Sequence, residues 1–258
     1  MGARAIIAGD GALPGLLAAA GPALTVRLQG MPGGTAGADI VARLERLGQL
    51  FNDLRAAGVT ELCFAGAMRR MPVDTGLLDP ETQALLPRLT AAMGQGDDAL
   101  LRDIVAIFEA EGFAVRGAHE LRPDLVAPAG AIHGAARPDG DAARARAVLA
   151  ALGPLDVGQA AVAGQGQMLG IETLQGSDAM LRFVADTAPG SRGVLVKRAK
   201  PGQDLRVDMP AIGPDTVALA AAAGLSGIEL QAGHVLLLDP AALGAACAAH
   251  GLDLWAVP

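Results

Sequence analysis

The chain contains only two lysines, Lys197 and Lys200, and both lie in a short segment that leads to Asp208. An ammonium group is a compact charge with rotatable donors that suits a phosphate oxygen, whereas a guanidinium prefers a flat, bidentate partner. Pro210 and Gly213 restrict the loop after Asp208, so its carboxylate could bind a metal, orient a water or act as a general base. The segment therefore predicts phosphate chemistry. The alternative is that two exposed lysines persisted by chance and that Asp208 is an ordinary turn residue.

A glycine turn follows the first predicted strand. Gly9, Asp10 and Gly11 come after the apolar run 3–8 and before apolar residues at helical spacing. In such a turn, backbone N–H groups can face a phosphate of a nucleotide or nucleotide sugar. Pro14 occupies the position of the third glycine of a dinucleotide fingerprint, and no acidic residue clearly ends the next strand. A purely structural turn is the alternative interpretation.

Further polar residues stand near the ends of predicted strands and helices. His119 follows a strand, in the position where open α/β sheets gather their ligands, although histidines are also common at helix starts. Gln159, Glu172 and Asp178 lie near strand or helix ends of the second half, and each alone could be structural. We expect Ser177 to cap the helix that carries Asp178. The histidines and cysteines show no zinc-ligand spacing.

Composition excludes several classes of protein. Of the 258 residues 52% are hydrophobic, so a sizeable core is available, but only 2% are aromatic. A formal net charge of −7 and the lack of aromatic stacking platforms argue against nucleic-acid binding. Two cysteines make a disulfide framework improbable, so we expect a cytoplasmic protein. No run of about 20 strongly apolar residues predicts a membrane span, and a peripheral contact with the membrane stays open.

The order of the elements predicts an α/β fold of two domains. Residues 1–121 alternate strand and helix signals, which indicates a Rossmann-like parallel sheet. Residues 122–139 are rich in Pro, Ala, Gly and Asp and are interpreted as a linker. Residues 140–258 are expected to form a mixed α/β domain that carries the catalytic residues. Within it we predict a hairpin turn at Gly164–Gly166, and strands 228–230 and 235–238 that pair with each other.

Eight motifs follow one another along the chain: Gly9–Pro14, Cys63–Gly66, Gly96–Arg102, Gly117–Glu120, Asp156–Gln159, Gln175–Arg182, Lys197–Pro201 and Arg206–Gly213. Their order resembles that of the LpxI-type UDP-2,3-diacylglucosamine pyrophosphatases of lipid A biosynthesis. The resemblance covers nearly the whole chain, and the ordered set is more specific than any one motif. Departures are mild: Asp10 stands where a third glycine is common, and Met209 stands where leucine is.

The resemblance implies an activity and a set of site residues. It implies hydrolysis of UDP-2,3-diacylglucosamine to UMP and 2,3-diacylglucosamine 1-phosphate, a Mg²⁺ cofactor, and two domains that hold the substrate between them. Asp208 matches the family's essential aspartate and is expected to be catalytic and to bind the metal. Lys200 is also expected to be catalytic, by neutralising charge on the phosphates. We also expect a homodimer, with peripheral contact to the inner membrane left open. The residues expected to bind substrate are Gly9, Asp10, Gly11, Gly66, His119, Gln159, Glu172, Asp178 and Arg206.

Two other functions remain open from the sequence. A nicotinamide-dependent oxidoreductase would use Gly9 and Gly11, but Pro14 and the missing ribose-binding acid argue against it. A lipid or nucleotide sensor would bind the same ligands without turnover.

Overall fold

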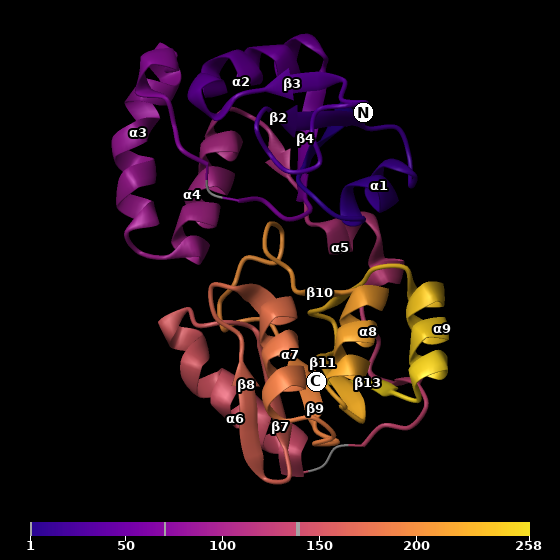
Figure 1. The fold of residues 1–258 in the computed structure, drawn as a ribbon. Coiled ribbons are helices and arrows are strands. Elements are labelled where there is room, and N and C mark those ends of the chain that lie inside the picture. The colour runs from indigo at the N-terminus through magenta and orange to yellow at the C-terminus, as the bar shows by residue number, and fades with distance from the viewer. Residues whose placement is uncertain (1, 70, 138–139) are drawn as a thin grey trace. The chain divides into compact units, whose positions relative to one another are not determined.

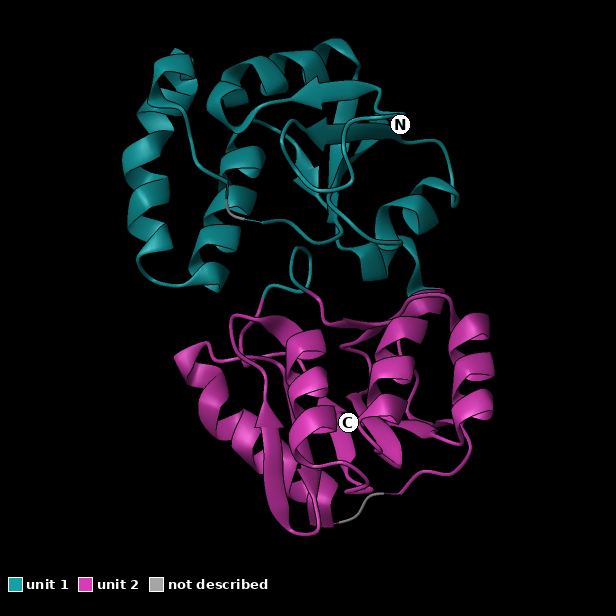
Figure 2. Ribbon diagram, viewed as in Figure 1, with its two compact units in different colours: residues 1–123, 204–208 teal, residues 124–203, 209–258 magenta. Residues whose placement is uncertain are grey.

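The computed structural model describes residues 2–69, 71–137 and 140–258, which form two compact units (Figure 1). The N-terminal unit comprises Met1–Pro123 together with Asp204–Asp208, and the C-terminal unit comprises Asp124–Gln203 and Met209–Pro258 (Figure 2). A segment of five residues from the second half of the sequence therefore belongs to the N-terminal unit.

The N-terminal unit is built on a parallel sheet with the strand order β3-β2-β1-β4-β5. The chain fills one side of β1 with β2 and β3 and then crosses to the other side of β1 to form β4. This order makes the gap between the carboxyl ends of β1 and β4 a topological switch point, where ligands bind in open α/β sheets. The strands are β1 (Ala3–Ala8), β2 (Leu24–Leu28), β3 (Ile40–Ala42), β4 (Val59–Ala65) and β5 (Ala114–Val115).

Helices cover this sheet and bury its apolar side chains. Leu50, Phe51 and Leu54 of one helix and Val105 and Phe108 of another enter the same core as the β1 and β2 side chains. The helices are α1 (Leu13–Ala18), α2 (Leu47–Ala56), α3 (Pro80–Met93), α4 (Asp97–Ala110) and α5 (Ala118–Leu121), with short 3₁₀ turns η1 (Leu44–Arg46) and η2 (Thr75–Leu77). The predicted Rossmann-like parallel sheet is thus confirmed.

The C-terminal unit contains a mixed sheet with the order β6-β13-β11-β9-β7-β8. Its central strands β9, β11 and β13 are parallel, whereas β6, β7 and β8 each run antiparallel to a neighbour. A separate parallel pair joins β10 to β12. The strands are β6 (Gly130–His133), β7 (Ala160–Gly164), β8 (Gln167–Ile171), β9 (Val194–Lys197), β10 (Ala211–Ile212), β11 (Gly227–Gln231), β12 (Leu236–Leu237) and β13 (Asp253–Val257).

Helices pack on both faces of the mixed sheet. One face carries α6 (Gly140–Leu152), which ends in the 3₁₀ turn η4 (Gly153–Leu155), and the other carries α7 (Gly176–Thr187), α8 (Pro214–Ala222) and α9 (Pro240–His250). On the α6 face, Glu229 is fully buried in the middle of the sheet. Its carboxylate accepts hydrogen bonds of 2.5 and 2.6 Å from Arg146 of α6 and one of 3.0 Å from the indole of Trp255. A C-terminal mixed α/β domain is therefore also confirmed.

Two local predictions for the C-terminal half had opposite outcomes. The hairpin is confirmed: β7 pairs with β8, and Gln165 and Gly166 turn the chain with φ of 53° and 76°. The predicted pairing of strands 228–230 and 235–238 is wrong, because β11 lies between β9 and β13 and β12 pairs with β10. The apolar pattern located both strands but carried no information about their partners.

Residues 122–139, interpreted from composition as a linker, contain regular structure. They include the 3₁₀ turn η3 (Pro123–Leu125) and β6, which pairs with β13. The boundary between the two units falls between Pro123 and Asp124, and the predicted Pro138 and Asp139 end of the linker lies outside the described residues. In the described part of the chain, every helix is too short or too polar to cross a membrane.

Candidate functional site

The carboxyl ends of β1 and β4 are brought together by glycines. Gly9 N donates to Ala65 O at 2.8 Å, and Asp10 and Ala67 exchange a pair of backbone hydrogen bonds. A Cβ on Gly9 would lie 2.4 Å from Ala67 O, and one on Gly66 would lie 2.5 Å from Asp10 O. The two predicted site glycines therefore allow the two loops to touch at the switch point of the sheet.

Asp10 and Gly11 are exposed at this edge of the sheet. The Asp10 carboxylate accepts a hydrogen bond of 2.9 Å from Gly11 N, and Gly11 adopts a φ of 94° with open space around its missing Cβ. The following helix α1 has only six residues, so little helix dipole backs this loop. Any phosphate contact here would therefore depend on the backbone of the loop more than on the N-terminus of α1.

A third loop, after β5, places His119 at the same edge of the sheet. The ring of His119 lies against Gly117, because a Cβ on Gly117 would be 2.3 Å from His119 Cε1. Nδ1 of His119 is buried and has no hydrogen-bond partner within the described residues. A buried ring nitrogen of this kind is free to contact a ligand or a water.

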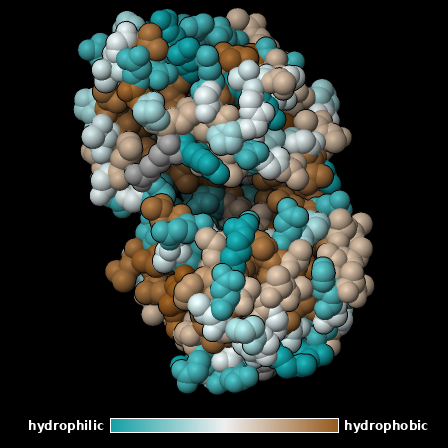
Figure 3. All heavy atoms as spheres, in the orientation of Figure 1, coloured by the Kyte–Doolittle hydropathy of each residue, from teal (hydrophilic) through white to brown (hydrophobic). Residues whose placement is uncertain are grey.

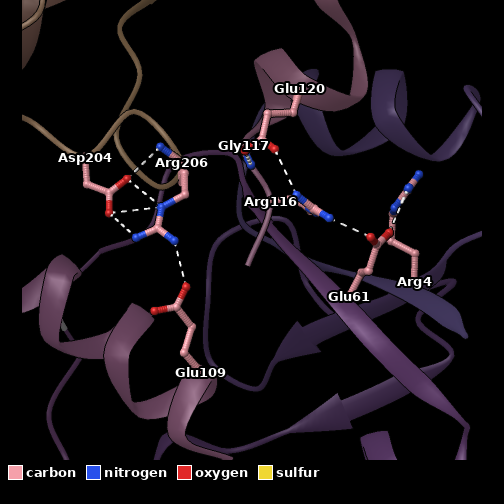
Figure 4. A network of polar contacts seen from close by, with 8 residues as sticks. All are labelled: Arg4, Glu61, Glu109, Arg116, Gly117, Glu120, Asp204 and Arg206. Atoms are coloured by element: carbon pink, nitrogen blue, oxygen red, sulfur yellow. Dashed lines mark hydrogen bonds and ion pairs between the residues drawn. The ribbon is translucent and has the colours of Figure 1, made fainter. Parts of the chain in front are cut away.

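The segment Asp204–Asp208 lies beside this third loop. A Cβ on Gly117 would come within 3.2 Å of Arg206 Cα, and Val207 packs against the core of the N-terminal unit. Arg206 donates to both oxygens of Asp204, at 3.0 and 2.7 Å, and to Glu109 of α4 at 2.7 Å (Figure 4). Arg206, expected to contact substrate, is thus held between two acidic side chains.

The charges in this cluster stabilise one another. The hydrogen bond from Arg206 holds the pKa of Asp204 below its ordinary value, with a smaller contribution from the charge of Arg102. In turn, Asp204 first and Glu109 second raise the pKa of the Arg206 guanidinium. Both Asp204 and Arg206 therefore stay ionised across the physiological pH range.

Asp208 is the last residue of this segment and is half-buried. Its backbone N–H donates to Asp204 O at 3.1 Å, as does that of Val207. The carboxylate predicted to be catalytic thus belongs structurally to the N-terminal unit, although the sequence assigned it to the C-terminal domain.

A second ion-paired network lies in the same unit, near the Gly117 loop. Glu61 accepts hydrogen bonds from Arg4 at 3.0 Å and from Arg116 at 3.3 Å, and Glu120 accepts one from Gly117 N at 2.9 Å (Figure 4). The hydrogen bond from Arg4 is the largest influence on Glu61 and lowers its pKa, against the opposing effect of burial. This network fixes the start of the loop that carries His119.

The two lysines lie in a polar cluster of the C-terminal unit. The Lys200 side chain is 12% exposed and forms an ion pair with Asp156. Nζ of Lys197 donates to Ser177 Oγ at 2.9 Å, and that hydroxyl donates to Glu172 at 2.9 Å. Both lysines are therefore held in place by defined partners, which argues against the alternative of two solvated surface side chains.

Gln159 joins this cluster through the backbone. Its carbonyl oxygen accepts from Arg198 N at 2.9 Å, and its side-chain Oε1 is buried without a partner in the described residues. Gln159 precedes β7, Glu172 follows β8, and Lys197 ends β9, so these residues meet at one end of the sheet. Asp178 is more exposed than these residues: 56% of its side chain on α7 is accessible to solvent, and its Oδ2 lies 3.9 Å from Nη2 of Arg182.

Sequence reasoning missed several residues of these clusters. Asp156, the partner of Lys200, lies inside one of the family motifs but had no signal of its own. Ser177 was expected to cap α7, but the N-cap is Gln175, and the Ser177 hydroxyl instead joins Lys197 to Glu172. Glu109 carried no signal, since its partner Arg206 is 97 positions away.

Nothing in the described residues forms a group of three or more His, Cys, Asp or Glu side chains able to hold a metal. Mg²⁺ is commonly bound by one or two carboxylates together with waters and substrate phosphates, so a lone carboxylate is compatible with it. Asp204 is bound by Arg206, and Asp208 is the second carboxylate of this segment and remains the one predicted to bind the metal.

A hydrophobic groove lies in the C-terminal unit between β8 and α7. It has a volume of about 260 Å³ and is lined by Gly170, Ile171, Thr173, Gln175, Gly176, Ala179, Met180 and Phe183. Phe183 is 57% exposed and the nearby Leu174 is 91% exposed. Hydrophobic side chains gather on this unit in the space-filling view (Figure 3).

Comparison with known proteins covers both units. The family model for the LpxI N-terminal domain matches residues 3–125, and that for the LpxI C-terminal domain matches residues 129–255. The chain belongs to the LpxI family. A relative from Caulobacter vibrioides, named UDP-2,3-diacylglucosamine pyrophosphatase LpxI, is 40% identical over 267 aligned positions, which cover 96% of this chain and 94% of the relative.

Membership of the LpxI family confirms the resemblance seen in the ordered motifs and the two-domain α/β fold. The division of the chain between the two LpxI domains falls between residues 125 and 129, close to the boundary between the compact units.

Proposed function

We propose that this protein hydrolyses the diphosphate bond of UDP-2,3-diacylglucosamine, yielding UMP and 2,3-diacylglucosamine 1-phosphate for lipid A biosynthesis. The observation that carries the proposal is the relative of 40% identity, which spans nearly the whole of both chains and is named for this pyrophosphatase activity. The products follow from the chemistry, because one water adds across the anhydride and each phosphorus keeps its own organic group.

Asp208 is the residue that we propose for the chemical step. Asp208 is half-buried and the turn fixes its backbone, so its carboxylate can orient a water for attack on phosphorus and accept the proton of that water as the P–O–P bond breaks. Mg²⁺, held by Asp208 and substrate oxygens, would neutralise charge on the diphosphate.

The loops at the carboxyl edge of the parallel sheet are proposed to contact the nucleotide sugar. Gly9 and Gly66 let the two loops touch at the switch point, and Gly11 beside them is exposed with open space around its missing Cβ, where a phosphate could closely approach the backbone. The unpartnered Nδ1 of His119 lies on the next loop and could contact a polar substrate group.

The polar cluster of the C-terminal unit is proposed to present two fixed ammonium groups, with the carboxylates of Asp156 and Glu172 in the same cluster. Lys200 and Lys197 are immobilised by Asp156 and Ser177, so little side-chain entropy is lost when a phosphate binds them. Gln159 offers its unpartnered Oε1 to a sugar hydroxyl. Lys200 therefore remains a proposed catalytic residue, and Gln159 and Glu172 remain proposed substrate-binding residues. Asp178 is the weakest of the proposed substrate-binding residues, because its side chain is 56% exposed.

The acyl chains of the substrate need apolar surface. We propose that the groove between β8 and α7 receives part of an acyl chain, because Ile171, Met180 and Phe183 line it and Phe183 is otherwise exposed to water. The same surface would suit the peripheral contact with the inner membrane that the sequence leaves open. The homodimer stays a prediction.

The activity is tested by incubating the purified protein with UDP-2,3-diacylglucosamine, with and without Mg²⁺, and separating the products by mass. We expect UMP and 2,3-diacylglucosamine 1-phosphate in equal amounts, with the rate strongly reduced when a chelator removes the metal. Release of UDP in place of UMP, or an unchanged substrate, would contradict the proposal. An unchanged substrate that nevertheless binds tightly would favour the non-catalytic sensor.

The nicotinamide-dependent oxidoreductase is the weaker alternative. It would place a dinucleotide at Gly9 and Gly11, where Pro14 is buried in α1 and packs close to Gly66. A lack of any thermal shift with NAD or NADP would remove it.

A further inference from the structure

We propose that Glu109 is a positioning residue for the hydrolysis: through Arg206 it fixes the turn that carries Asp208 on the N-terminal unit. This inference rests on the proposed function, because it assigns Glu109 a role in placing the carboxylate proposed to act on the diphosphate. It also gives Arg206 a structural role in the site in place of direct contact with substrate.

The first observation is the way in which Arg206 is shared. Its Nη1 donates to Glu109 Oε1 at 2.7 Å, while Nε and Nη2 donate to the two oxygens of Asp204 at 3.0 and 2.7 Å. A guanidinium that grips one carboxylate with two parallel hydrogen bonds is geometrically fixed. Glu109 stands near the end of α4, so it joins this fixed group to a helix of the N-terminal unit.

The second observation is that Asp204 links the guanidinium to Asp208. Asp204 accepts from Arg206 through its side chain and from the backbone N–H groups of Val207 and Asp208 through its carbonyl, both at 3.1 Å. The same residue therefore sets the position of the arginine and of the Asp208 backbone. Any shift of Arg206 relative to α4 is carried along this turn to the carboxylate.

The third observation concerns how the turn is attached. No helix or strand lies between Asp204 and Asp208. Within the described residues, Val207 is the one hydrophobic side chain of this turn that packs, partly buried, against the core of the N-terminal unit. Glu109 supplies a polar attachment to α4 beside that apolar one. A displacement of about 1 Å at a reacting group lowers turnover about 10²-fold, so such an attachment affects rate far more than folding.

Glu111 provides a matched control, because it lies two residues further along and also pairs with an arginine, Arg55. The exposed side-chain fractions are similar, 44% for Glu109 and 37% for Glu111. Arg55 belongs to α2 and has no part in the Asp208 turn. Each change to glutamine removes one exposed ion pair from the same end of the same unit, and such pairs contribute little to stability.

The test compares kcat and KM for UMP release by the wild type, Glu109→Gln and Glu111→Gln. We expect Glu109→Gln to lower kcat about 10- to 100-fold with KM changed less than about threefold, and Glu111→Gln to stay within about twofold of the wild type. Amide hydrogen exchange should accelerate at Val207 and Asp208 in Glu109→Gln and remain unchanged in Glu111→Gln. If Glu109 contributed only to overall stability, Glu109→Gln would neither accelerate amide exchange selectively at this turn nor lower kcat while KM stays nearly the same.

Three outcomes would overturn the inference. Equal kcat for the two glutamine variants would show that the link from Arg206 to α4 does not affect turnover. The proposed function would still stand in that case if Asp208→Asn is inactive. Amide exchange at Val207 and Asp208 that is as slow in Glu109→Gln as in the wild type would show that the turn is stable without Glu109. Absence of UMP from the wild type would remove the proposed function and this role with it.

Discussion

At the scale of single residues, Gly66 combines two constraints. It adopts a φ of 89°, and a Cβ there would lie 2.5 Å from Asp10 O and 3.0 Å from Pro14 Cγ. Gly66→Ala should therefore cost about 1–2 kcal/mol for the left-handed backbone and more for the collision, and it should also displace the Asp10 loop. Denaturant unfolding would measure the loss of stability.

Gly112 is the control for Gly66→Ala, because its φ is 93° while a Cβ added there would have nothing within 4 Å. We expect Gly112→Ala to show the conformational cost alone and to leave UMP release unchanged. Equal losses of stability in the two variants would mean that the β1 and β4 loops are not in the close contact described.

The candidate residues could be found from the sequence where their type was unusual. Two lysines in an arginine-rich chain led to Lys197 and Lys200, and glycines after strands led to Gly9 and Gly66. Their partners could not be found in this way. Asp156 is one acid among many, and only the fold brings it to Lys200.

At the scale of elements, local signals predicted well what local interactions decide. The β7–β8 hairpin depends on two adjacent residues that accept positive φ, Gln165 and Gly166, so its turn was visible in the sequence. The partners of β11 and β12 depend on the whole sheet, because consecutive strands need not be neighbours. That is why strands 228–230 and 235–238 were located but wrongly paired.

The turn Asp204–Asp208 shows the same limit more sharply. By its place in the chain it belongs to the C-terminal half, but its contacts with Glu109 and Gly117 place it in the N-terminal unit. A contact across 97 positions has no spacing rule from which it could be predicted. The consequence for function is that the proposed catalytic carboxylate depends on α4.

At the scale of the whole molecule, the N-terminal unit should respond to acid. Four of its carboxyl groups have a pKa lower in the folded protein than in model compounds: Glu61, Asp79, Asp103 and Asp204. Such a carboxyl group contributes its full stabilisation at any pH above its ordinary pKa of about 4. The contribution is lost as the pH falls from there through the lower pKa that the group has in the folded protein. Protonation below about pH 4 should therefore destabilise the N-terminal unit.

The only tryptophan makes this prediction measurable. Trp255 is fully buried in the C-terminal unit, whereas circular dichroism reports on the helices of both units. As the pH is lowered from about 6, where these carboxyl groups are ionised, we expect ellipticity to fall first, while Trp255 fluorescence is still that of the folded protein. A change in Trp255 fluorescence that precedes or coincides with the loss of ellipticity would contradict a separate response of the N-terminal unit.

The proposed hydrolysis depends on one carboxylate. Its most direct test is the kcat for UMP release from UDP-2,3-diacylglucosamine, measured for Asp208→Asn beside the wild type. Asparagine keeps the shape of the side chain and the backbone N–H bond to Asp204, but it removes the charge. We expect kcat to fall by about 10³-fold or more, with substrate affinity within a few-fold of the wild type and unchanged circular dichroism. A variant that releases UMP at a rate near that of the wild type would contradict the assignment of Asp208.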